Sequence, residues 1–428
     1  MTARELARRV LERVERDRAW ATPTLDGELA RAGLDDRDRR LASELVYGVL
    51  RQRLRIDRAL AAHADLSRTP PRVVVALRVA AYQLLFLDRV PAYAVVDDAV
   101  SAARGAGGAK LAGFANAVLR KLGARGEPPI APDDVATSAS LPAWIVGELA
   151  AACEPAELAD RALSFARAAP LVARANRTRT TRAAVMELLV AAGCETREIA
   201  SAPEAFAIDG LGDPARSPSF TNGLWTVQDT GAQLVALAAA PRAGQRVLDA
   251  CAGVGGKSTH LAELAELAEL AGDDANGASG AQIDAADRSA VKLALGVATA
   301  KRLGLAGIRS ICCDLLDPAA PLGDAYDLIV LDAPCTGLGV LRRHPDAKWR
   351  LVPGDVPRLA QVQAQLLDAV ARRLAPGGAL IYSVCTFTRA EGPEQIRAFA
   401  ARSGLRVVLE QRTWPPDADA FYLARLER

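Results

Sequence analysis

Two cysteines, Cys335 and Cys385, follow apolar runs that are typical of buried β-strands, IVLDAPC at 329–335 and LIYSVC at 380–385. A free cysteine commonly serves as a small buried hydrophobic residue. Two cysteines placed directly after neighbouring parallel strands would instead meet at the carboxyl edge of the sheet, where such folds bind their ligands. This placement, with Asp332 in the same motif, favours nucleophilic catalysis by a thiolate.

A glycine-rich segment, VLDACAGVGGKSTH at 247–260, joins a predicted strand to a helix beginning near Lys257. The nucleoside triphosphate pattern G-x-x-x-x-G-K-[ST] fails because Cys251 stands at its first glycine, and the dinucleotide pattern G-x-G-x-x-G fails at Ser258. S-adenosylmethionine fits best, because methyltransferases of this topology use a short glycine-rich turn after the first strand. The predicted cofactor loop comprises Cys251, Ala252, Gly253, Val254, Gly255, Gly256 and Lys257.

Acidic residues are expected at the ends of the next strands. Asp284 ends the run AQID, where a carboxylate would accept both ribose hydroxyls of the cofactor. Asp314 follows IRSICC, where it would contact the adenine, and Asp332 follows the next strand. The repeat LAELAELAELAG at 261–272 predicts a lengthened helix and a surface loop, which accounts for the long spacing between the glycines and Asp284.

A thiolate beside a sulfonium methyl donor suits methylation at C5 of cytosine. That carbon is a poor nucleophile until a thiolate adds to C6, and a further group must stabilise the N3 and N4 edge of the ring. Cys335 and Cys385 are the two candidates for this work. Cys312 and Cys313 lie inside a predicted strand and are expected to be inert.

The periodicity of the chain predicts several domains. Residues 1–125 show apolar residues at helical spacing throughout, and a segment rich in Gly and Pro at 126–139 predicts a linker. Residues 140–240 mix helical and extended runs and predict an α+β region. From 241 to 428, strand-like runs alternate with helices, which predicts an α/β, doubly wound parallel sheet.

Composition excludes several classes of protein. The net charge of +2 gives no global signal for nucleic acid, and the abundance of arginine also fits a GC-rich genome, so any RNA surface must be local. Seven cysteines without a C-x-x-C pair and only three histidines argue against a disulfide framework or metal site. The N-terminus resembles a charged amphipathic helix, not a signal peptide. We therefore expect a cytoplasmic monomer without metal or membrane partner.

The motifs resemble those of the bacterial ribosomal RNA cytosine-5 methyltransferases of the RsmB (Sun, or Fmu) type over essentially the whole chain. ELVYGVLR and GFANAVLRKL resemble the NusB fold, and LVARANRTRTTR and FTNGLWTVQDTGAQLV resemble the family's middle region. CAGVGGK, DAPCTGLGVLRRHPDAKW and YSVCT resemble its catalytic domain. The resemblance implies a NusB-like RNA-binding domain, a methyltransferase domain, S-adenosylmethionine as cofactor and 16S ribosomal RNA as partner.

The resemblance also implies residue roles. Cys385 would attack C6, Cys335 would assist product release, Asp332 would contact the cytosine edge, and Lys257 would lie beside cofactor and base. DNA cytosine methyltransferases use one cysteine, in a Pro-Cys motif, so the second cysteine favours RNA over DNA.

RNA contacts are expected at two places. Arg174 and Asn176 match an R-x-N element that resembles an RNA-contacting feature of the family. Arg342, Arg343 and His344 follow the D-A-P-C motif and would face phosphates or the target loop.

The chain departs from the family pattern at three places. Gly253-Val254 replaces Ala-Pro, Thr336 and Thr386 follow the two cysteines where serine is commoner, and Glu391-Gly392 replaces an acidic-Asn pair. Two other functions stay open: methylation of transfer RNA, and an RNA-binding assembly factor with a lapsed methyltransferase domain.

Overall fold

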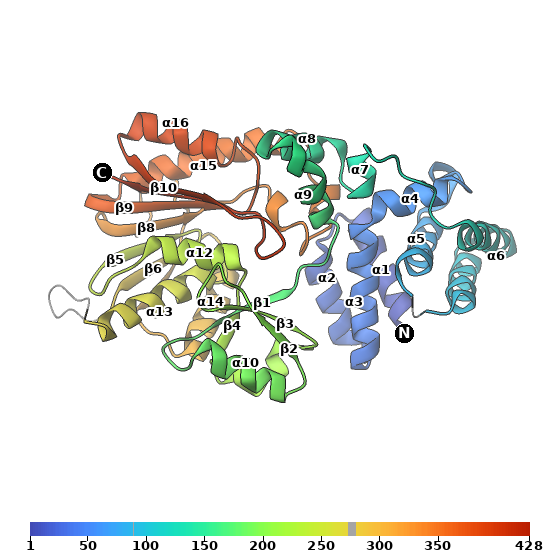
Figure 1. The fold of residues 1–428 in the computed structure, drawn as a ribbon, viewed down its shortest axis with the longest axis horizontal. Helices are drawn as coiled ribbons and strands as arrows, with labels where there is room; N and C mark the ends of the chain where they lie inside the picture. Colours follow the sequence, from blue (N-terminus) through green and yellow to red (C-terminus); the bar gives the residue numbers. More distant parts are fainter. Residues whose placement is uncertain (89, 273–279) are drawn as a thin grey trace. The chain divides into compact units, whose positions relative to one another are not determined.

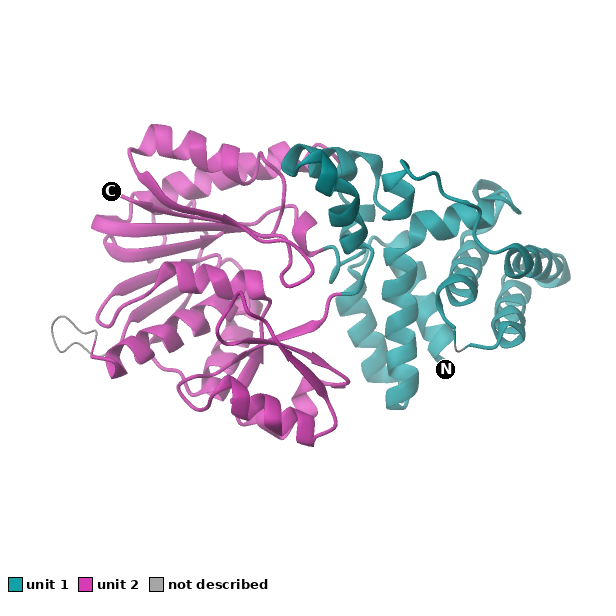
Figure 2. Ribbon diagram, viewed as in Figure 1, with its two compact units in different colours: residues 1–168, 341–351 teal, residues 169–340, 352–428 magenta. Residues whose placement is uncertain are grey.

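The structure, a computed structural model, describes residues 1–88, 90–272 and 280–428, which form two compact units (Figure 2). The first unit contains residues 1–168 and 341–351, and the second contains residues 169–340 and 352–428. The boundaries of the predicted domains stay a prediction. The loop predicted after the LAE repeat falls largely on residues 273–279, outside the described residues.

The first unit is helical, as the periodicity predicts. Its α-helices are α1 (Ala3–Arg16), α2 (Ala21–Ala32), α3 (Asp36–Arg51), α4 (Arg53–Ala61), α5 (Pro71–Phe86), α6 (Ala92–Arg125), α7 (Val135–Ser138), α8 (Ala143–Ala152) and α9 (Leu158–Phe165). A capping box between Thr2 and Glu5 starts α1, and Pro71 at the first position starts α5. Non-helical backbone at Gly107 and Gly108 interrupts α6. The hydrophobic core of this unit is formed mainly by α1 to α6.

The second unit begins with a small antiparallel sheet of order β2-β3-β1-β4. Its elements are β1 (Leu171–Ala175), α10 (Arg182–Ala191), β2 (Glu195–Glu198), β3 (Ala205–Asp209), α11 (Pro218–Thr221) and β4 (Trp225–Val227). Trp225, Phe206 and Leu189 are buried in its core, and Phe220 packs against the Trp225 ring. This arrangement gives the predicted α+β character a definite antiparallel topology.

The rest of the second unit surrounds a seven-stranded sheet of order β10-β11-β9-β8-β5-β6-β7. The elements are α12 (Thr230–Ala239), β5 (Arg246–Ala250), α13 (Gly256–Leu270), β6 (Gln282–Asp287), α14 (Ala290–Leu303), β7 (Ile308–Cys312), β8 (Tyr326–Asp332), α15 (Asp355–Ala371), β9 (Leu374–Val384), α16 (Pro393–Ser403), β10 (Arg406–Arg412) and β11 (Tyr422–Glu427). Helices α15 and α16 cover one face, and α12, α13 and α14 cover the other (Figure 1).

The sheet confirms the predicted doubly wound class and adds an antiparallel end. Strands β5 to β9 pair in parallel, but β11 pairs antiparallel with both β9 and β10. The last two strands, β10 and β11, depart from the predicted alternation of strands with helices. Because the short connection from β10 to β11 contains no crossover helix, the two strands form an antiparallel pair.

Candidate active site

The carboxyl ends of the parallel strands surround a pocket of about 620 Å³ in the second unit. Ligands of open α/β folds bind at this edge because the strand ends and the following loops converge there. Sulfur, carboxylate and backbone groups line the pocket. Among the residues predicted from sequence, it brings together Cys251, Gly253, Asp314, Asp332, Cys335 and Cys385.

The glycine-rich loop turns sharply between β5 and α13. Gly255 has a φ of +78° and lies so close to α14 that a Cβ there would be 2.9 Å from the Gly296 Cα. Glycine is therefore needed at this position for both conformation and space. At Gly253 a Cβ would meet only the Cys251 carbonyl oxygen, 4.0 Å away, which leaves the pocket side of the loop open.

The acid at the end of β6 is Asp287, and this corrects the prediction for Asp284. Asp287 lines the pocket and accepts hydrogen bonds from the Gly253 N–H at 2.9 Å and the Ser289 N–H at 2.8 Å. Asp284 lies three residues earlier, on the opposite face of the strand, and lines a different pocket. The strand continues as DAAD beyond the predicted AQID, and this continuation is the signal that identifies the later acid.

The Asp284 side chain contacts other residues of the sheet and does not line the pocket that holds the two cysteines. Arg309 donates to its two carboxylate oxygens at 2.7 and 2.8 Å, and the Tyr326 hydroxyl donates at 2.6 Å. Burial raises the pKa of Asp284, but these hydrogen bonds outweigh burial and leave the pKa below its ordinary value. The carboxylate therefore stays ionised while it ties β6 to β7 and β8.

A buried acid that sequence reasoning missed supports the loop from below. Asp249 of β5 is fully buried and accepts a hydrogen bond from the Ser258 hydroxyl in the first turn of α13. Burial raises the pKa of Asp249 to about 6, because the charged form loses its hydration. The contact joins the last strand residues before the loop to the helix after it.

The two predicted cysteines lie side by side. The Cys335 and Cys385 sulfur atoms are 3.3 Å apart, within sulfur hydrogen-bonding distance. The hydrogen bond with Cys385 raises the pKa of the Cys335 thiol well above its ordinary range, and burial adds to the increase. Cys335 is therefore held as the protonated thiol, able to donate its S–H to the neighbouring sulfur.

Lys257 and Asp332 form the charged part of the site. The Lys257 ammonium nitrogen lies 2.5 Å from one Asp332 oxygen, and the Ser383 hydroxyl donates to the other at 2.8 Å. Burial lowers the pKa of Lys257, but the adjacent carboxylate raises it more, so the pKa is above its ordinary value. A cation and an anion thus stand together at the end of β8.

Glu391 links the segments that follow the two cysteines. Its fully buried carboxylate accepts from the Thr336 N–H at 2.8 Å, the Thr336 hydroxyl at 2.6 Å and the Thr388 hydroxyl at 2.8 Å. The Thr336 and Thr386 hydroxyls are also within 3.0 Å of each other. The threonines that replace serine therefore keep a hydroxyl-mediated connection between the two cysteine loops.

Gly392 explains the third departure from the family pattern. A Cβ at this position would lie 3.1 Å from the Tyr422 ring and 3.2 Å from the Thr388 carbonyl oxygen. The backbone here packs against β11 too closely for a larger side chain without some movement. The Tyr422 ring and the Thr388 carbonyl group therefore occupy the space that a side chain at position 392 would need.

Arg174 and Asn176 do not occupy an RNA-facing surface, which corrects their predicted role. Both are buried, with 0% and 1% of their surface exposed. Arg174 contacts Glu263 and Gln228, while the Asn176 amide donates to the Gly223 and Leu303 carbonyl oxygens at 2.9 and 3.0 Å. A side chain enclosed in this way is not available to a phosphate.

The segment after the D-A-P-C motif packs within the helical unit. Arg342 is buried, which argues against the phosphate contact predicted for it, whereas Arg343 is partly exposed and His344 is exposed. The buried Lys348 donates to the Arg51 and Ser140 carbonyl oxygens at 2.8 and 2.6 Å. Residues 341–351 therefore belong to the first unit, where Trp349 packs against the hydrophobic core.

The fold and the pocket define a Rossmann-like methyltransferase domain with a two-cysteine site. Residues 236–427 match the 16S rRNA methyltransferase RsmB/F family, residues 1–124 the NusB family, and residues 141–213 the RsmF/B-like ferredoxin-like domain. The chain belongs to the RsmB/F family of ribosomal RNA small subunit methyltransferases. It is therefore an S-adenosylmethionine-dependent ribosomal RNA methyltransferase, as its motifs predict.

Individual relatives support this membership. A probable ribosomal RNA small subunit methyltransferase B of Synechocystis is 33% identical, over 93% of this chain and 89% of its own length. The ribosomal RNA small subunit methyltransferase B of Vibrio cholerae is 34% identical, over 86% and 82%. The crystal structure of PH0851 has the same fold, with a TM-score of 0.80 and 21% identity over 100% of this chain and 99% of its own.

Proposed function

We propose that this enzyme methylates C5 of a cytosine in 16S ribosomal RNA through a covalent bond between Cys385 and C6 of the base. The observation that carries the proposal is the pair of sulfur atoms 3.3 Å apart at one pocket with Asp332. The names of the relatives support small-subunit ribosomal RNA as the methyl acceptor. To reach the pocket, the target cytosine must leave its base stack.

The cofactor residues are assigned by their position in the pocket. Asp287 would accept the ribose hydroxyls, because each of its oxygens keeps a lone pair beyond the backbone hydrogen bond it already accepts. Asp314 would contact the adenine, and the open backbone at Gly253 leaves room for the amino acid part. The bound cofactor supplies the methyl group. Val254, half exposed, replaces a proline without filling this space.

The remaining residues act on the base. The Cys385 thiolate would add to C6, which moves electron density to C5 so that C5 can take the methyl group. The methylated C5 then loses its proton to a water molecule. Breaking the bond between sulfur and C6 restores the aromatic ring and the thiolate. Asp332, held by Lys257 and Ser383, would accept from the N4 amino group at the cytosine edge. Cys335, kept protonated beside Cys385, would assist the release step.

A fluorinated substrate tests these roles. Fluorine at C5 of the target cytosine blocks the loss of the C5 proton, so the wild-type enzyme should form a covalent adduct stable to denaturing gel electrophoresis. Cys385→Ala should form none, whereas Cys335→Ala should accumulate adduct even with unmodified RNA. Equal loss of capture in both variants would contradict the assigned roles.

Two measurements separate this proposal from the alternatives. Bisulfite sequencing of ribosomal and transfer RNA from a deletion strain identifies the RNA that loses 5-methylcytosine. A lapsed methyltransferase domain would leave both unchanged. Loss of the mark in transfer RNA alone would exclude ribosomal RNA as the acceptor. The monomeric state stays a prediction.

A further inference from the structure

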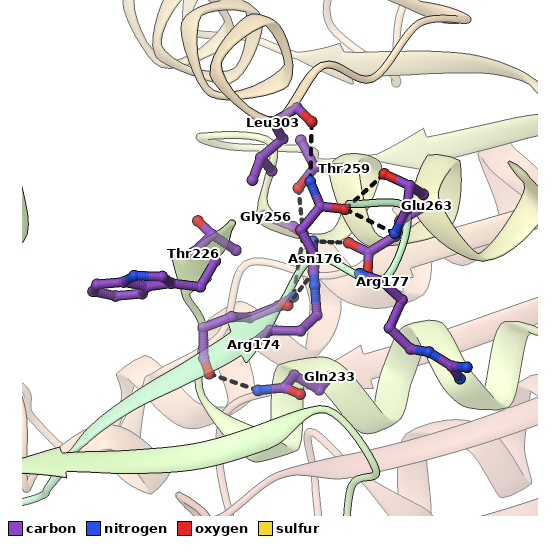
Figure 3. Close-up of polar contacts among 12 residues, drawn as sticks. Arg174, Asn176, Arg177, Thr226, Gln233, Gly256, Thr259, Glu263 and Leu303 are labelled. Carbon is purple, nitrogen blue, oxygen red and sulfur yellow. Dashed lines mark hydrogen bonds and ion pairs between the residues drawn. The ribbon is translucent and has the colours of Figure 1, made fainter. Parts of the chain in front are cut away.

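Arg174, on β1 of the small antiparallel sheet, reaches the helix that follows the cofactor loop. Its guanidinium is fully buried, and one nitrogen donates to a Glu263 carboxylate oxygen at 3.0 Å on α13 (Figure 3). A second nitrogen donates to the Gln228 side-chain oxygen and lies 3.5 Å from the Gly256 carbonyl oxygen. One arginine fork therefore contacts α13 at its first residue, Gly256, and at Glu263, seven residues or about two turns later.

The Gly256 carbonyl is the point where these contacts converge. It accepts from the Gln228 amide at 3.1 Å and from the Thr259 hydroxyl at 3.1 Å, in addition to the contact with Arg174 (Figure 3). Gly256 is the first residue of α13 and is bonded directly to Lys257. The position of this peptide group therefore sets where the Lys257 side chain begins.

Glu263 holds the same arginine from the other side. Its second carboxylate oxygen accepts from the Arg177 N–H at 3.0 Å, so the carboxylate bridges the Arg174 side chain and the backbone after β1 (Figure 3). Both charged groups are almost wholly excluded from water, with 0% and 1% of their side-chain surface exposed. The attraction within a buried ion pair repays the loss of hydration only where further hydrogen bonds satisfy both members. Both members have such bonds here, although the Arg174 Nε has no hydrogen-bond partner among the described residues.

The neighbouring Asn176 anchors the other side of the loop. Its amide donates to the carbonyl oxygen of Leu303, which is the last residue of α14. The same helix contains Gly296, which packs against Gly255. The R-x-N element thus contacts both helices that flank the glycine-rich loop. An element that served only to hold the small sheet together would not need contacts at these two points.

We infer that Arg174 is a positioning residue, which fixes the Gly256 carbonyl and through it the pairing of Lys257 with Asp332. The inference rests on the proposed assignment of the 251–257 loop and Lys257 to the cofactor and the base. Without the guanidinium fork, the first turn of α13 loses its tether to β1. Cofactor binding and methyl transfer then weaken, while RNA binding stays unchanged.

Two variants test this role without leaving a charge unpaired in the core. Arg174→Lys keeps a cation beside Glu263 but lacks the fork that also reaches Gln228 and Gly256. Gln228→Met leaves the ion pair but removes both the acceptor for the second Arg174 nitrogen and the hydrogen bond to the Gly256 carbonyl. Each variant should weaken S-adenosylmethionine binding about tenfold and lower kcat, because small misplacements of reacting groups reduce rates strongly.

The matched control is Arg302→Met. Arg302 also joins a flanking helix to the small sheet, donating to the Phe220 and Trp225 carbonyl oxygens at 2.7 and 2.9 Å, but it does not contact α13 in the hydrogen bonds of the described residues. Cofactor binding in this variant should stay within about twofold of the wild type. Hydrogen exchange of the Thr259 amide, which donates to the Gly255 carbonyl oxygen, should accelerate in the two test variants and not in this control.

The outcomes separate the inference from the proposed function. Wild-type protein that fails to bind S-adenosylmethionine in calorimetry would overturn the proposed function itself. Wild-type binding with unchanged affinity in both test variants would overturn only the role of Arg174. An equal loss in Arg302→Met would show general destabilisation of the sheet, and weakened RNA binding with unchanged cofactor affinity would restore the RNA-contact interpretation. Both results would reject the positioning role.

Discussion

The Cys335 and Cys385 sulfur atoms lie 3.3 Å apart, although 50 residues separate them in the chain. They come from the ends of the adjacent parallel strands β8 and β9, so the sheet register sets their distance. The buried Glu391 carboxylate then fixes the segments behind them through Thr336 and Thr388. The proton of the Cys335 thiol therefore lies within sulfur hydrogen-bonding distance of the Cys385 sulfur.

The first prediction concerns the reactivity of Cys335. Its hydrogen bond with Cys385 is the largest cause of its raised pKa, so Cys385→Ala should lower that pKa toward the ordinary thiol range. More Cys335 thiolate is then present at pH 8, and its alkylation by iodoacetamide should be several-fold faster than in the wild type. Mass spectrometry of the modified peptide measures this rate.

Cys385→Ser provides the control for that experiment. The shorter serine hydroxyl keeps a polar partner near Cys335, so the increase in alkylation rate should be smaller than with alanine. A Cys335 rate that does not change in either variant would show that burial alone keeps this thiol protonated.

The second prediction compares two acids on one strand. Asp287→Asn should weaken S-adenosylmethionine binding about tenfold or more, because a carboxylate accepts hydroxyl hydrogen bonds more strongly than an amide. Asp284→Asn should leave that affinity within about twofold, because Asp284 faces Arg309 and Tyr326 away from the cofactor pocket. Isothermal titration calorimetry of both variants decides between them, and the reverse order would reinstate Asp284.

The pair of acids also shows what could be predicted from the sequence. The glycine-rich loop, the D-A-P-C motif and the second cysteine were identified because each follows a strand with a clear apolar pattern. The choice of Asp284 was wrong because β6 is QIDAAD, with acids at its third and sixth residues. The sequence alone does not indicate which of the two acids ends the strand. The pairing of β6 with β7, which runs as far as Asp287 opposite Cys312, identifies Asp287 as the terminal residue.

The sequence also does not show which arginine side chains are buried. Arg174 and Arg342 are arginines in segments rich in arginine, and their neighbours Arg177 and Arg343 are more exposed. The pattern gives no sign of which of these side chains turns inward, because the decision depends on a partner far along the chain, such as Glu263 for Arg174. The antiparallel placement of β11 depends in the same way on a long-range contact, its pairing with β9.

The third prediction concerns pH and Asp249. Its folded-state pKa of about 6 is above its ordinary value, so the native state binds this proton more tightly than the unfolded chain does. The contribution to stability is therefore complete below the unfolded pKa and is lost as pH rises through about 6. Asp249→Asn lacks this titration.

Urea unfolding at several pH values measures the effect. Relative to the wild type, the unfolding free energy of Asp249→Asn should rise by on the order of 2 kcal/mol between pH 4 and pH 7. Asp284→Asn is the control with the opposite sign, because the pKa of Asp284 is lowered and its contribution is lost toward acid. A difference between Asp249→Asn and the wild type that does not vary with pH would mean that Asp249 stays ionised throughout.

The last prediction tests whether Glu391 aligns the two cysteines. Glu391→Gln places an amide N–H₂ where four donors now meet a carboxylate: the Thr336 N–H, the hydroxyls of Thr336 and Thr388, and the Gln363 side-chain amide. At least one of these hydrogen bonds must break, and the segments behind the sulfur atoms then shift. Because reacting groups misplaced by about 1 Å lose roughly a hundredfold in rate, single-turnover methyl transfer should fall by about that factor.

The cofactor pocket residues do not contact Glu391 in the hydrogen bonds of the described chain, so S-adenosylmethionine affinity should not change. Thr388→Val, which removes only one of the four donors, should lose less activity, and a larger loss there than in Glu391→Gln would assign the alignment to the threonine instead.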